Sequence, residues 1–221
     1  MLYIVPTPLG NLEDITARAK TTLGACDFII AENPSQTHKL LQLLTLPKKE
    51  VVQFADHNEL KVLDKIVERL KTQTACLVSD AGTPTISDPG FRLVRACREQ
   101  NIEVVSLPGP VAAITALAGS GLPTDKFLFC GFLPKTEPKL IKQIEEARDN
   151  AATLVAYESP QRLLKTIESL IKHFPEAKLV VARELTKLHE EYLTGSPQEV
   201  LDILKQRPSI KGEITLLVSF K

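Results

Sequence analysis

The densest turn of the chain follows directly on an apolar run at residues 75–78. It reads VSDAGTPTISDPG (78–90) and gathers glycine, proline, aspartate and hydroxyl residues in one short stretch. Glycine lets the backbone approach another group closely, and proline fixes the path of the chain. Open α/β sheets hold their ligands at the carboxyl ends of their strands. The stretch therefore predicts a strand that ends in a ligand-binding loop.

A capping residue followed by proline recurs at four expected helix starts. The pairs are Asp88-Pro89, Gly109-Pro110, Ser159-Pro160 and Ser196-Pro197. Each is an ordinary way to begin a helix, and a glutamate three residues after the last cap predicts a capping box there. Three of the pairs closely follow an expected strand, however, so the same turns also fit loops that gather around a ligand.

The familiar signatures of nucleotide and metal chemistry are missing. There is no GxxxxGK[ST], no GxGxxG after a strand, no HExxH and no GxSxG, and the four histidines are scattered. Phosphate cradling by a P-loop, hydride transfer and zinc chemistry are therefore poor candidates. What remains is a site of backbone groups, small side chains and a few fixed polar groups, which suits a ligand with an amino-acid head and an adenosine.

Composition places the chain among soluble globular proteins, with 43% hydrophobic and 24% charged residues. The 27 basic and 27 acidic residues balance, so a global electrostatic grip on nucleic acid is not indicated. The four cysteines are far apart in sequence and read as reduced core thiols. No signal peptide, transit peptide or membrane span is visible, so a cytoplasmic protein without membrane contact is expected.

Strand and helix patterns alternate along the chain, which predicts an α/β fold of two domains. The first, 1–122, is expected to be a doubly wound, mostly parallel sheet that ends in a small-residue connector helix. The second, 123–221, is expected to hold a mixed sheet, because the strands at 178–184 and 190–195 are joined by a loop too short for a crossover helix. Five strands are expected in each: 2–6, 27–32, 51–55, 75–80 and 102–108, then 126–132, 153–158, 178–184, 190–195 and 212–220.

Six stretches, read in order, resemble the successive motifs of one family. They are VPTPLGNLEDIT (5–16), VSDAGTPTISDPG (78–90), the stretch 107–134, YESPQRLLKTI (157–167), ARELTKLHEE (182–191) and KGE (211–213). Together they resemble the tetrapyrrole-methylase-type (class III) S-adenosylmethionine methyltransferases. Within that family they are most similar to the enzymes that methylate a cytidine ribose 2'-hydroxyl of small-subunit (16S) ribosomal RNA.

The resemblance implies S-adenosyl-L-methionine as methyl donor, no metal, a homodimer, and a cofactor cleft between the two domains. The residues that match the family's cofactor-binding positions are Pro8, Leu9, Gly10, Gly82, Thr83, Pro84 and Ile86, with Asp80 and Asp88 shaping the second loop, then Val111, Ala112, Ala113, Tyr157, Glu158, Arg183, Glu184, Leu185 and Gly212.

Methyl transfer is an in-line displacement, for which a protein supplies mainly alignment and desolvation. A ribose hydroxyl is a poor nucleophile near neutral pH, so a base or a cation that steadies the developing alkoxide should help. Glu32, and Lys187 with Glu184, are the candidates for these catalytic roles. The plainer reading of the same residues is a helix-cap carboxylate and a solvated lysine.

Three departures from the family pattern concern the substrate. Close relatives read Glu-Asp-Thr-Arg where this chain has Glu32-Asn33-Pro34-Ser35, so a second acid and an arginine that could hold a phosphate are lost. A dense basic cluster after GFLP is diluted to Lys135, Lys139 and Lys142. The chain also stops after its last strand, whereas many members carry a C-terminal extension.

Three functions follow from these observations. The first is methylation of a ribose in small-subunit ribosomal RNA, the partner that the motifs favour. The second is a shortened paralogue that methylates another RNA or a small molecule, which the departures favour. The third is a non-catalytic module that binds the cofactor or RNA. Fold-level likeness alone does not decide between them.

Overall fold

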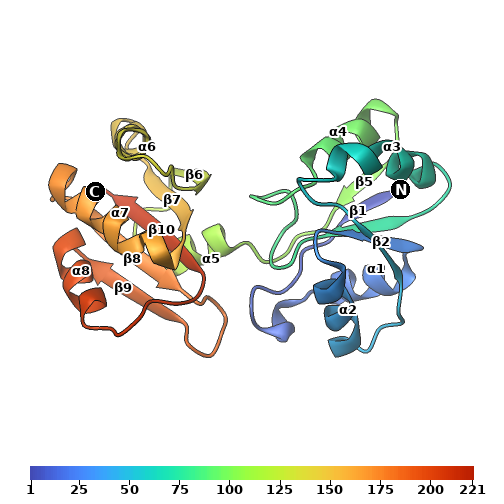
Figure 1. Cartoon of the computed structure of the whole chain (residues 1–221), viewed down its shortest axis with the longest axis horizontal. Coiled ribbons are helices and arrows are strands. Elements are labelled where there is room, and N and C mark those ends of the chain that lie inside the picture. The colour runs from blue at the N-terminus through green and yellow to red at the C-terminus, as the bar shows by residue number, and fades with distance from the viewer. The chain divides into compact units, whose positions relative to one another are not determined.

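The computed structural model describes all 221 residues and divides them into two compact units, 1–111 and 112–221 (Figure 1). Each unit holds one five-stranded sheet. The α/β class and the two-unit organisation therefore agree with what the sequence predicts.

The first sheet is entirely parallel. Its strands are β1 (Leu2–Ile4), β2 (Phe28–Ala31), β3 (Glu50–Gln53), β4 (Ala75–Val78) and β5 (Val104–Ser106), in the order β3-β2-β4-β1-β5. β2 and β4 are fully buried, as strands covered on both faces must be. This order places the ends of β1, β2 and β4 next to one another at a single edge of the sheet.

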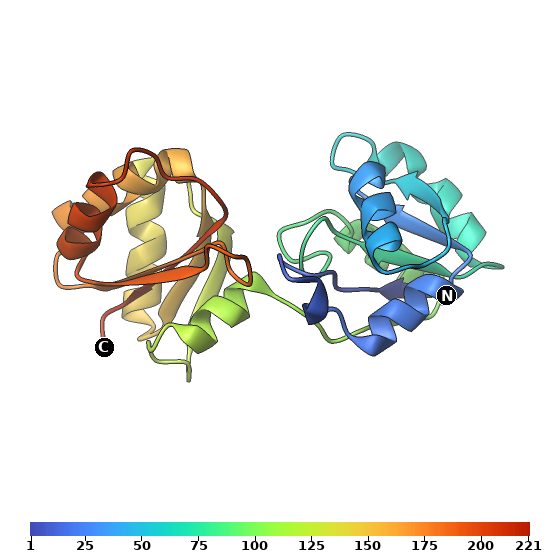
Figure 2. The same cartoon turned by 90° about the horizontal axis from the view of Figure 1, so that it is seen from below.

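Helices cover both faces of this sheet. Alternate residues of β2 point into two separate hydrophobic clusters: Phe28 and Ile30 pack with α3 (Glu59–Leu70) and α4 (Phe91–Glu99), whereas Ile29 packs with α1 (Ala17–Ala25) and α2 (Pro34–Leu43). Figure 1 shows the two helix pairs above and below the strands, and Figure 2 views the sheet from the side of α1 and α2. The doubly wound arrangement is thus confirmed. A short 3-10 turn, η1 (Leu12–Asp14), follows β1.

The second sheet is mixed, as the short connection between its neighbouring strands predicts. It consists of β6 (Phe127–Phe132), β7 (Thr153–Glu158), β8 (Lys178–Arg183), β9 (Glu191–Gly195) and β10 (Ile214–Ser219), in the order β6-β7-β10-β8-β9. Only β6 and β7 run parallel, and the other three pairings are antiparallel.

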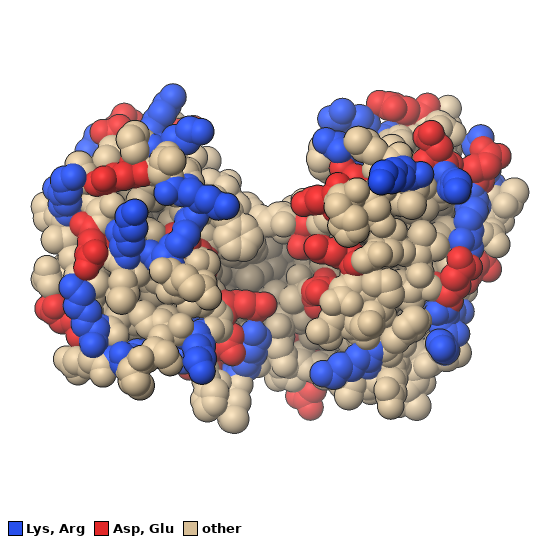
Figure 3. Space-filling view, viewed as in Figure 1, with Lys and Arg blue, Asp and Glu red and all other residues tan.

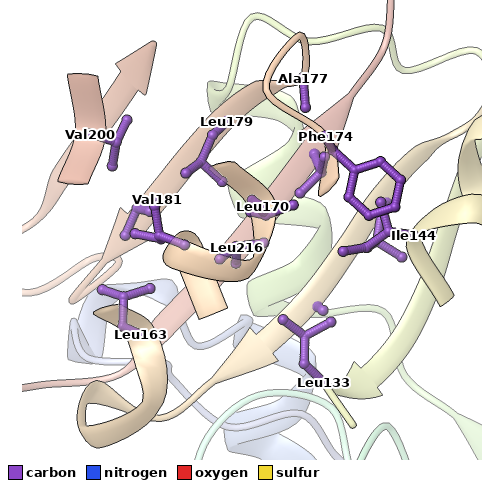
Figure 4. Close-up of a cluster of buried hydrophobic side chains, with 14 of the residues drawn as sticks. Leu133, Ile144, Leu163, Leu170, Phe174, Ala177, Leu179, Val181, Val200 and Leu216 are labelled. Carbon is purple, nitrogen blue, oxygen red and sulfur yellow. The ribbon is translucent and has the colours of Figure 1, made fainter. Parts of the chain in front are cut away.

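The helices of the second unit are α5 (Ala112–Gly119), α6 (Glu137–Asp149), α7 (Pro160–His173) and α8 (Pro197–Lys205). α6, α7 and α8 contribute side chains such as Ile144, Leu170 and Val200 to a cluster that includes Leu216 of β10 (Figure 4). This cluster is the main core of the second unit.

The division between the units precedes α5, at Val111/Ala112. The sequence placed the boundary after the connector helix, at residue 122. The helix packs against β7 and β10, so its contacts assign it to the second unit.

Two of the four expected cap-proline helix starts are wrong. α4 begins at Phe91 after the N-cap Gly90 rather than at Pro89, and α5 begins at Ala112 rather than at Pro110. Both prolines instead belong to the loops at the sheet edge. Ser159-Pro160 does begin α7, although without a side-chain cap bond, and Ser196-Pro197 begins α8 with the full capping box.

All four cysteines are free, and Cys26, Cys76 and Cys97 are buried, while Cys130 is half-buried. The interpretation as reduced core thiols is therefore confirmed for three of them. The longest helices carry too many polar residues over too short a length for any of them to span a membrane.

Candidate functional site

The loops after β1 and β4 are joined by a pair of backbone hydrogen bonds. The Thr7 amide donates to the Gly82 carbonyl at 2.9 Å, and the Gly82 amide donates to the Thr7 carbonyl at 3.0 Å. β1 and β4 are neighbours in the parallel sheet, so both loops leave the same edge. The structure thus brings Pro8, Leu9 and Gly10 beside the 78–90 loop, at the edge where α/β sheets hold ligands.

Hydroxyl side chains fix this junction from within. Thr7 Oγ1 donates to the Ser79 carbonyl at 3.1 Å, and Ser79 Oγ donates to the Gly82 carbonyl at 3.1 Å; both side chains are buried. Neither residue was predicted to belong to the site. Hydroxyl residues directly after an apolar strand were the available signal, because such side chains commonly bond to nearby backbone.

Gly82 is required by its surroundings. Its φ is +80°, and a Cβ at this position would lie 3.1 Å from Leu9 Cδ2 and 3.5 Å from the Pro110 carbonyl oxygen. The next residue ties in a third loop, since Thr83 Oγ1 donates to the same Pro110 carbonyl at 2.9 Å. The loops after β1, β4 and β5 therefore meet around Gly82, and Val111 follows directly on this junction.

The loop continues in strained backbone. Thr85 and Ser87 have φ values of 74° and 68°, in the left-handed region that residues other than glycine rarely occupy. Between them Ile86 exposes its side chain, whereas the neighbouring Pro84 is buried. Strain of this kind persists only where the surrounding structure enforces it, and it concentrates at ligand sites.

Acidic side chains cluster at the same edge. Burial, together with the nearby charges of Glu32 and Asp80, raises the pKa of Asp88 to about 6. Burial also raises the pKa of Asp80, partly offset by the Asn33 side chain. Figure 3 shows acidic side chains gathered on one flank of the first unit. Carboxylates that repel one another favour a bound positive group.

Asn33 explains the departure at residues 32–35. Its Oδ1 accepts from the amides of Ser35 and Gln36 at 3.2 and 3.4 Å, so it is the N-cap of α2, and Pro34 is the first helical residue. An aspartate would cap equally well. The chain therefore retains the cap and loses a negative charge beside Asp80, while Ser35 still leaves the position without the arginine of its relatives. Sequence reasoning missed this start, although it is a fifth cap-proline pair.

The predicted residues of the second unit also converge. β10 lies between β7 and β8, and Ile214 at its start is paired with both Glu158 and Arg183 at their ends. Tyr157, Glu158, Arg183, Glu184 and Gly212 therefore lie at one edge of the second sheet. Ala112 and Ala113 do not follow one of these strands; they are the first two residues of α5.

The Glu158 side chain is already committed within the protein. It is 3% exposed and accepts hydrogen bonds from Arg162 at 2.8 and 2.9 Å, from the Ser159 amide at 2.7 Å and from Thr166 Oγ1 at 2.7 Å. Arg162 also donates to the Leu133 carbonyl at 2.8 Å. A carboxylate with four donors has little capacity left for a ligand, so any contribution of Glu158 to binding comes from its backbone.

Glu184 and Lys187 form a clasp with the start of β10. Glu184 Oε1 accepts from Lys187 Nζ and from the Glu213 amide, both at 2.9 Å, while Lys187 Nζ also donates to Glu213 Oε2 at 2.9 Å. Glu184 itself has a φ of 53°. A Cβ on Gly212 would lie 2.5 Å from Glu184 Cδ, so only glycine fits there.

This clasp settles the charge of both candidates. Burial lowers the pKa of Lys187, but its hydrogen bonds to Glu184 and Glu213 outweigh that effect and the pKa is raised. The hydrogen bond from Lys187 lowers the pKa of Glu184. Lys187 is therefore a fixed cation at neutral pH rather than a base. Glu32, the third candidate, is an exposed carboxylate at the end of β2 in the first unit.

Arg183 is held by a second ionic network. Its Nε donates to Glu191, its Nη1 donates to the Lys211 carbonyl at 2.9 Å, and Arg207 donates to Glu191 Oε2 at 2.7 Å. The hydrogen bond from Arg207, together with that from Arg183, lowers the pKa of Glu191 to about 2. Neither Glu191 nor Arg207 was predicted, because their pairing depends on contacts distant in sequence.

Tyr157 and Leu185 complete the predicted set. The Tyr157 ring meets Phe129 and Phe132 edge to face, with centroids 5.1 and 5.7 Å apart. Leu185 is buried. These residues provide an apolar surface at the same edge as the two ionic networks, which is the kind of lining that small-molecule sites use.

No group of three or more His, Cys, Asp or Glu residues is placed to hold a metal ion. The expectation of metal-free chemistry, which the resemblance implies, stays a prediction. The assignment of the site residues to a cofactor stays a prediction as well, although those of the first unit lie at one sheet edge, as do those of the second unit apart from Ala112 and Ala113.

Comparison with solved structures supports the fold. A crystal structure of diphthine synthase superimposes with a TM-score of 0.78 at 13% identity and covers 99% of this chain and 89% of that one. Uroporphyrin-III-C-methyltransferase from Thermus thermophilus gives a TM-score of 0.65 at 18% identity, over 99% of this chain and 91% of that one. At these identities the likeness concerns the fold alone.

Comparison of sequences reaches further. A protein of Hydrogenobaculum sp. (strain Y04AAS1) named ribosomal RNA small subunit methyltransferase I is 46% identical over 221 residues, which cover 99% of this chain and 95% of that protein. Proteins of the same name from Thermotoga maritima and Escherichia coli O157:H7 are 41% and 44% identical, and 98% and 77% of their lengths are covered. Relatives about as long as this chain and relatives that are clearly longer therefore bear the same name.

A family model described as Tetrapyrrole (Corrin/Porphyrin) Methylases matches residues 1–201. That match spans the Gly82 junction of the first unit and the Glu184–Lys187 pair of the second. The chain therefore belongs to the tetrapyrrole methylase family of S-adenosylmethionine-dependent methyltransferases, in which it groups with the ribosomal RNA small subunit methyltransferases I.

Proposed function

We propose that the protein methylates a ribose 2'-hydroxyl of small-subunit (16S) ribosomal RNA, with S-adenosyl-L-methionine as the donor. The observation that carries this proposal is 46% identity to a relative named ribosomal RNA small subunit methyltransferase I, over 95% of that protein's length. The three loops that meet around Gly82, and the residues that converge beside β10, agree with it.

The first unit would hold part of the donor through backbone and charge. The junction of Thr7, Gly82 and Pro110 offers closely approaching backbone, and Glu32, Asp80 and Asp88 supply negative charge beside it. The second unit would contribute the backbone at Glu158, the Tyr157 ring and the strand after Gly212.

The bound donor supplies an electrophilic methyl group on a sulfonium. The protein has to align the ribose hydroxyl with it and exclude water. Lys187, held as a cation by Glu184 and Glu213, is suited to steady the developing alkoxide. Glu184 is occupied by this lysine and acts as a positioning residue. Glu32 of the first unit stays a candidate for accepting the hydroxyl proton.

Methylation of another RNA or of a small molecule is the alternative that the sequence departures support. In the departure at residues 32–35, Asn33 preserves the cap of α2, but Ser35 does not replace the lost arginine. The dilution of the lysines at 135, 139 and 142 remains in favour of the alternative. A homodimer without metal is retained as part of the main proposal.

Two measurements test the proposal. Purified protein, tritiated S-adenosylmethionine and 30S particles should give incorporation at a single ribose, located by mapping 2'-O-methyl groups. Deletion of the gene should remove the same modification from the cell's 16S RNA. An unchanged methylation map after deletion would refute 16S ribosomal RNA as the substrate. Donor binding without methyl transfer to any RNA would favour a non-catalytic module.

A further inference from the structure

A surface depression of about 350 Å³ lies beside the Gly82 junction in the first unit. It is lined by the loop after β3, the end of the 78–90 loop and the start of α4. The lining residues are Asp56, Glu59, Ser87, Asp88, Pro89, Phe91 and Arg92. Its volume is within the range of small-ligand sites.

Phe91 stands at the rim of this depression with 51% of its surface exposed. It is the first residue of α4, and the preceding Gly90 fixes the direction of the helix. Gly90 has a φ of +134°, and a Cβ there would lie 2.7 Å from Leu77 Cδ2. The aromatic ring is therefore presented by a rigid turn rather than by a free loop.

Two guanidinium groups lie over the Phe91 ring, with Arg92 Cζ at 5.4 Å and Arg95 Cζ at 5.5 Å from its centroid. Arg92 is anchored by an ion pair with Glu59, which is only 5% exposed. Arg95 is exposed and takes part in none of the ion pairs of the first unit. Figure 3 shows Lys and Arg side chains gathered over α4.

This combination matches the chemistry of single-stranded RNA. Unpaired bases stack on aromatic rings and guanidinium planes, and arginines hold the phosphates. Carboxylates such as Asp56 and Asp88 can accept hydrogen bonds from the N–H groups of a base. An apolar protein partner fits less well, because four of the seven lining residues are charged.

We propose that the depression is a subsite for one nucleotide of an RNA substrate, with its base stacked on Phe91 and its phosphate held by Arg95. The inference deepens the proposed function and rests on RNA being the substrate. It also offers a source of RNA affinity in a chain whose overall charge is balanced.

Fluorescence anisotropy with a labelled single-stranded fragment of 16S RNA tests the subsite apart from catalysis. Phe91→Ala should weaken binding about tenfold, because stacking on an aromatic side chain contributes on that order. Phe91→Tyr should retain most of the affinity. Arg95→Ala should weaken binding and reduce the slope of log affinity against log salt by about one. Affinity for S-adenosylmethionine, measured by calorimetry, should stay the same in all three variants.

Two matched controls come from the second unit. Phe127 is 42% exposed but has no guanidinium over its ring, and Arg148 lies 5.7 Å from the centroid of the buried Phe174. Phe127→Ala and Arg148→Ala should leave RNA affinity unchanged. Circular dichroism confirms that each variant is folded.

The outcomes separate the two proposals. If the wild type binds the RNA but transfers no methyl group to it, the proposed function fails. The subsite is then still tested by comparing the RNA affinity of Phe91→Ala with that of the wild type. Unchanged affinity in Phe91→Ala and Arg95→Ala overturns the subsite, as does the absence of RNA binding by the wild type. Weaker binding in the control variants by the same factor also overturns it.

Discussion

The backbone of Thr7 and that of Gly82 exchange two hydrogen bonds, at 2.9 and 3.0 Å, between loops that are more than 70 residues apart in the chain. The exchange makes one rigid junction from two turns that each look ordinary in the sequence. Any residue that perturbs Gly82 therefore displaces the first loop as well as the second.

Substitution of Gly82 should weaken the binding of S-adenosylmethionine. Gly82→Ala places a Cβ 3.1 Å from Leu9 Cδ2 in a backbone conformation with φ of +80°, and Gly82→Val or Pro84→Leu should disturb the same loop more strongly. We expect at least a tenfold rise in Kd, about 1.4 kcal/mol, by calorimetry.

Gly121→Ala is the control for that experiment. Gly121 also has a positive φ, +70°, but a Cβ there meets nothing within 4 Å. Both variants therefore carry the conformational cost of a left-handed alanine, about 1–2 kcal/mol of stability. Equal donor affinity in the two variants would show that the site is not at the Gly82 junction.

The two roles of Asn33 should separate by substitution. Asn33→Ala removes the cap of α2 and should lower the free energy of unfolding by about 1 kcal/mol. Asn33→Asp keeps the cap but adds a charge beside Asp80, so it should raise the pKa of Asp80 further. Denaturant unfolding measures the first effect, and carboxyl NMR titration measures the second. If Asn33→Asp lowered the free energy of unfolding as much as Asn33→Ala does, the capping assignment would be contradicted.

Removal of the Lys187 charge should slow methyl transfer more than it weakens binding. Lys187→Met leaves Glu184 and Glu213 without their shared cation, and loss of one group that stabilises developing charge costs tenfold or more in kcat. Single-turnover measurements with saturating donor report that step. Lys205→Met is the matched control, since Lys205 pairs with Glu168 on the exposed surface of the second unit. An unchanged rate in Lys187→Met would remove it from the mechanism.

Asp88 should make the protein less stable at neutral pH than in mild acid. Its pKa is raised by burial to about 6 in the folded protein, against about 3.9 for an unfolded aspartate. The folded state therefore binds the proton more tightly, so this contribution is favourable below about pH 4 and is lost as pH rises through about 6.

Asp88→Asn tests that sign directly. The variant should be more stable than the wild type at pH 7, and the difference should shrink as pH falls from about 6 towards 4. Denaturant midpoints of both proteins across this range give the comparison. Asp64→Asn, on the exposed surface of α3, is the control and should show no such trend. A difference that grows on acidification would refute the assignment.

The fold could be predicted closely because each element carries its own local pattern. All ten expected strands are present, and the short link between β8 and β9 correctly indicated an antiparallel pair. Helix starts were less reliable, since Asp88-Pro89 and Gly109-Pro110 look like caps but serve the loops around Gly82. A cap-proline pair alone does not show whether the turn begins a helix or packs against another loop.

The site could be predicted only as a set of candidate loops. Gathering at the sheet edges followed from the positions of strand ends, as with Gly82 beside Thr7. Which side chains are already used in ion pairs within the protein could not be predicted. The pairs of Glu158 with Arg162 and of Glu191 with Arg183 depend on geometry that no spacing rule supplies. These partners decide which groups remain available to a ligand.

The place of β10 in the second sheet has a consequence for biosynthesis. β10 leaves the ribosome after the other four strands of its sheet, yet it separates β7 from β8 and pairs with both. Until it emerges, the second unit consists of two detached strand pairs with open inner edges, a state that is prone to wrong pairing. The sheet edge that gathers Tyr157 and Arg183, which we propose to contact the donor, is therefore completed in one late step, when a single strand closes the sheet.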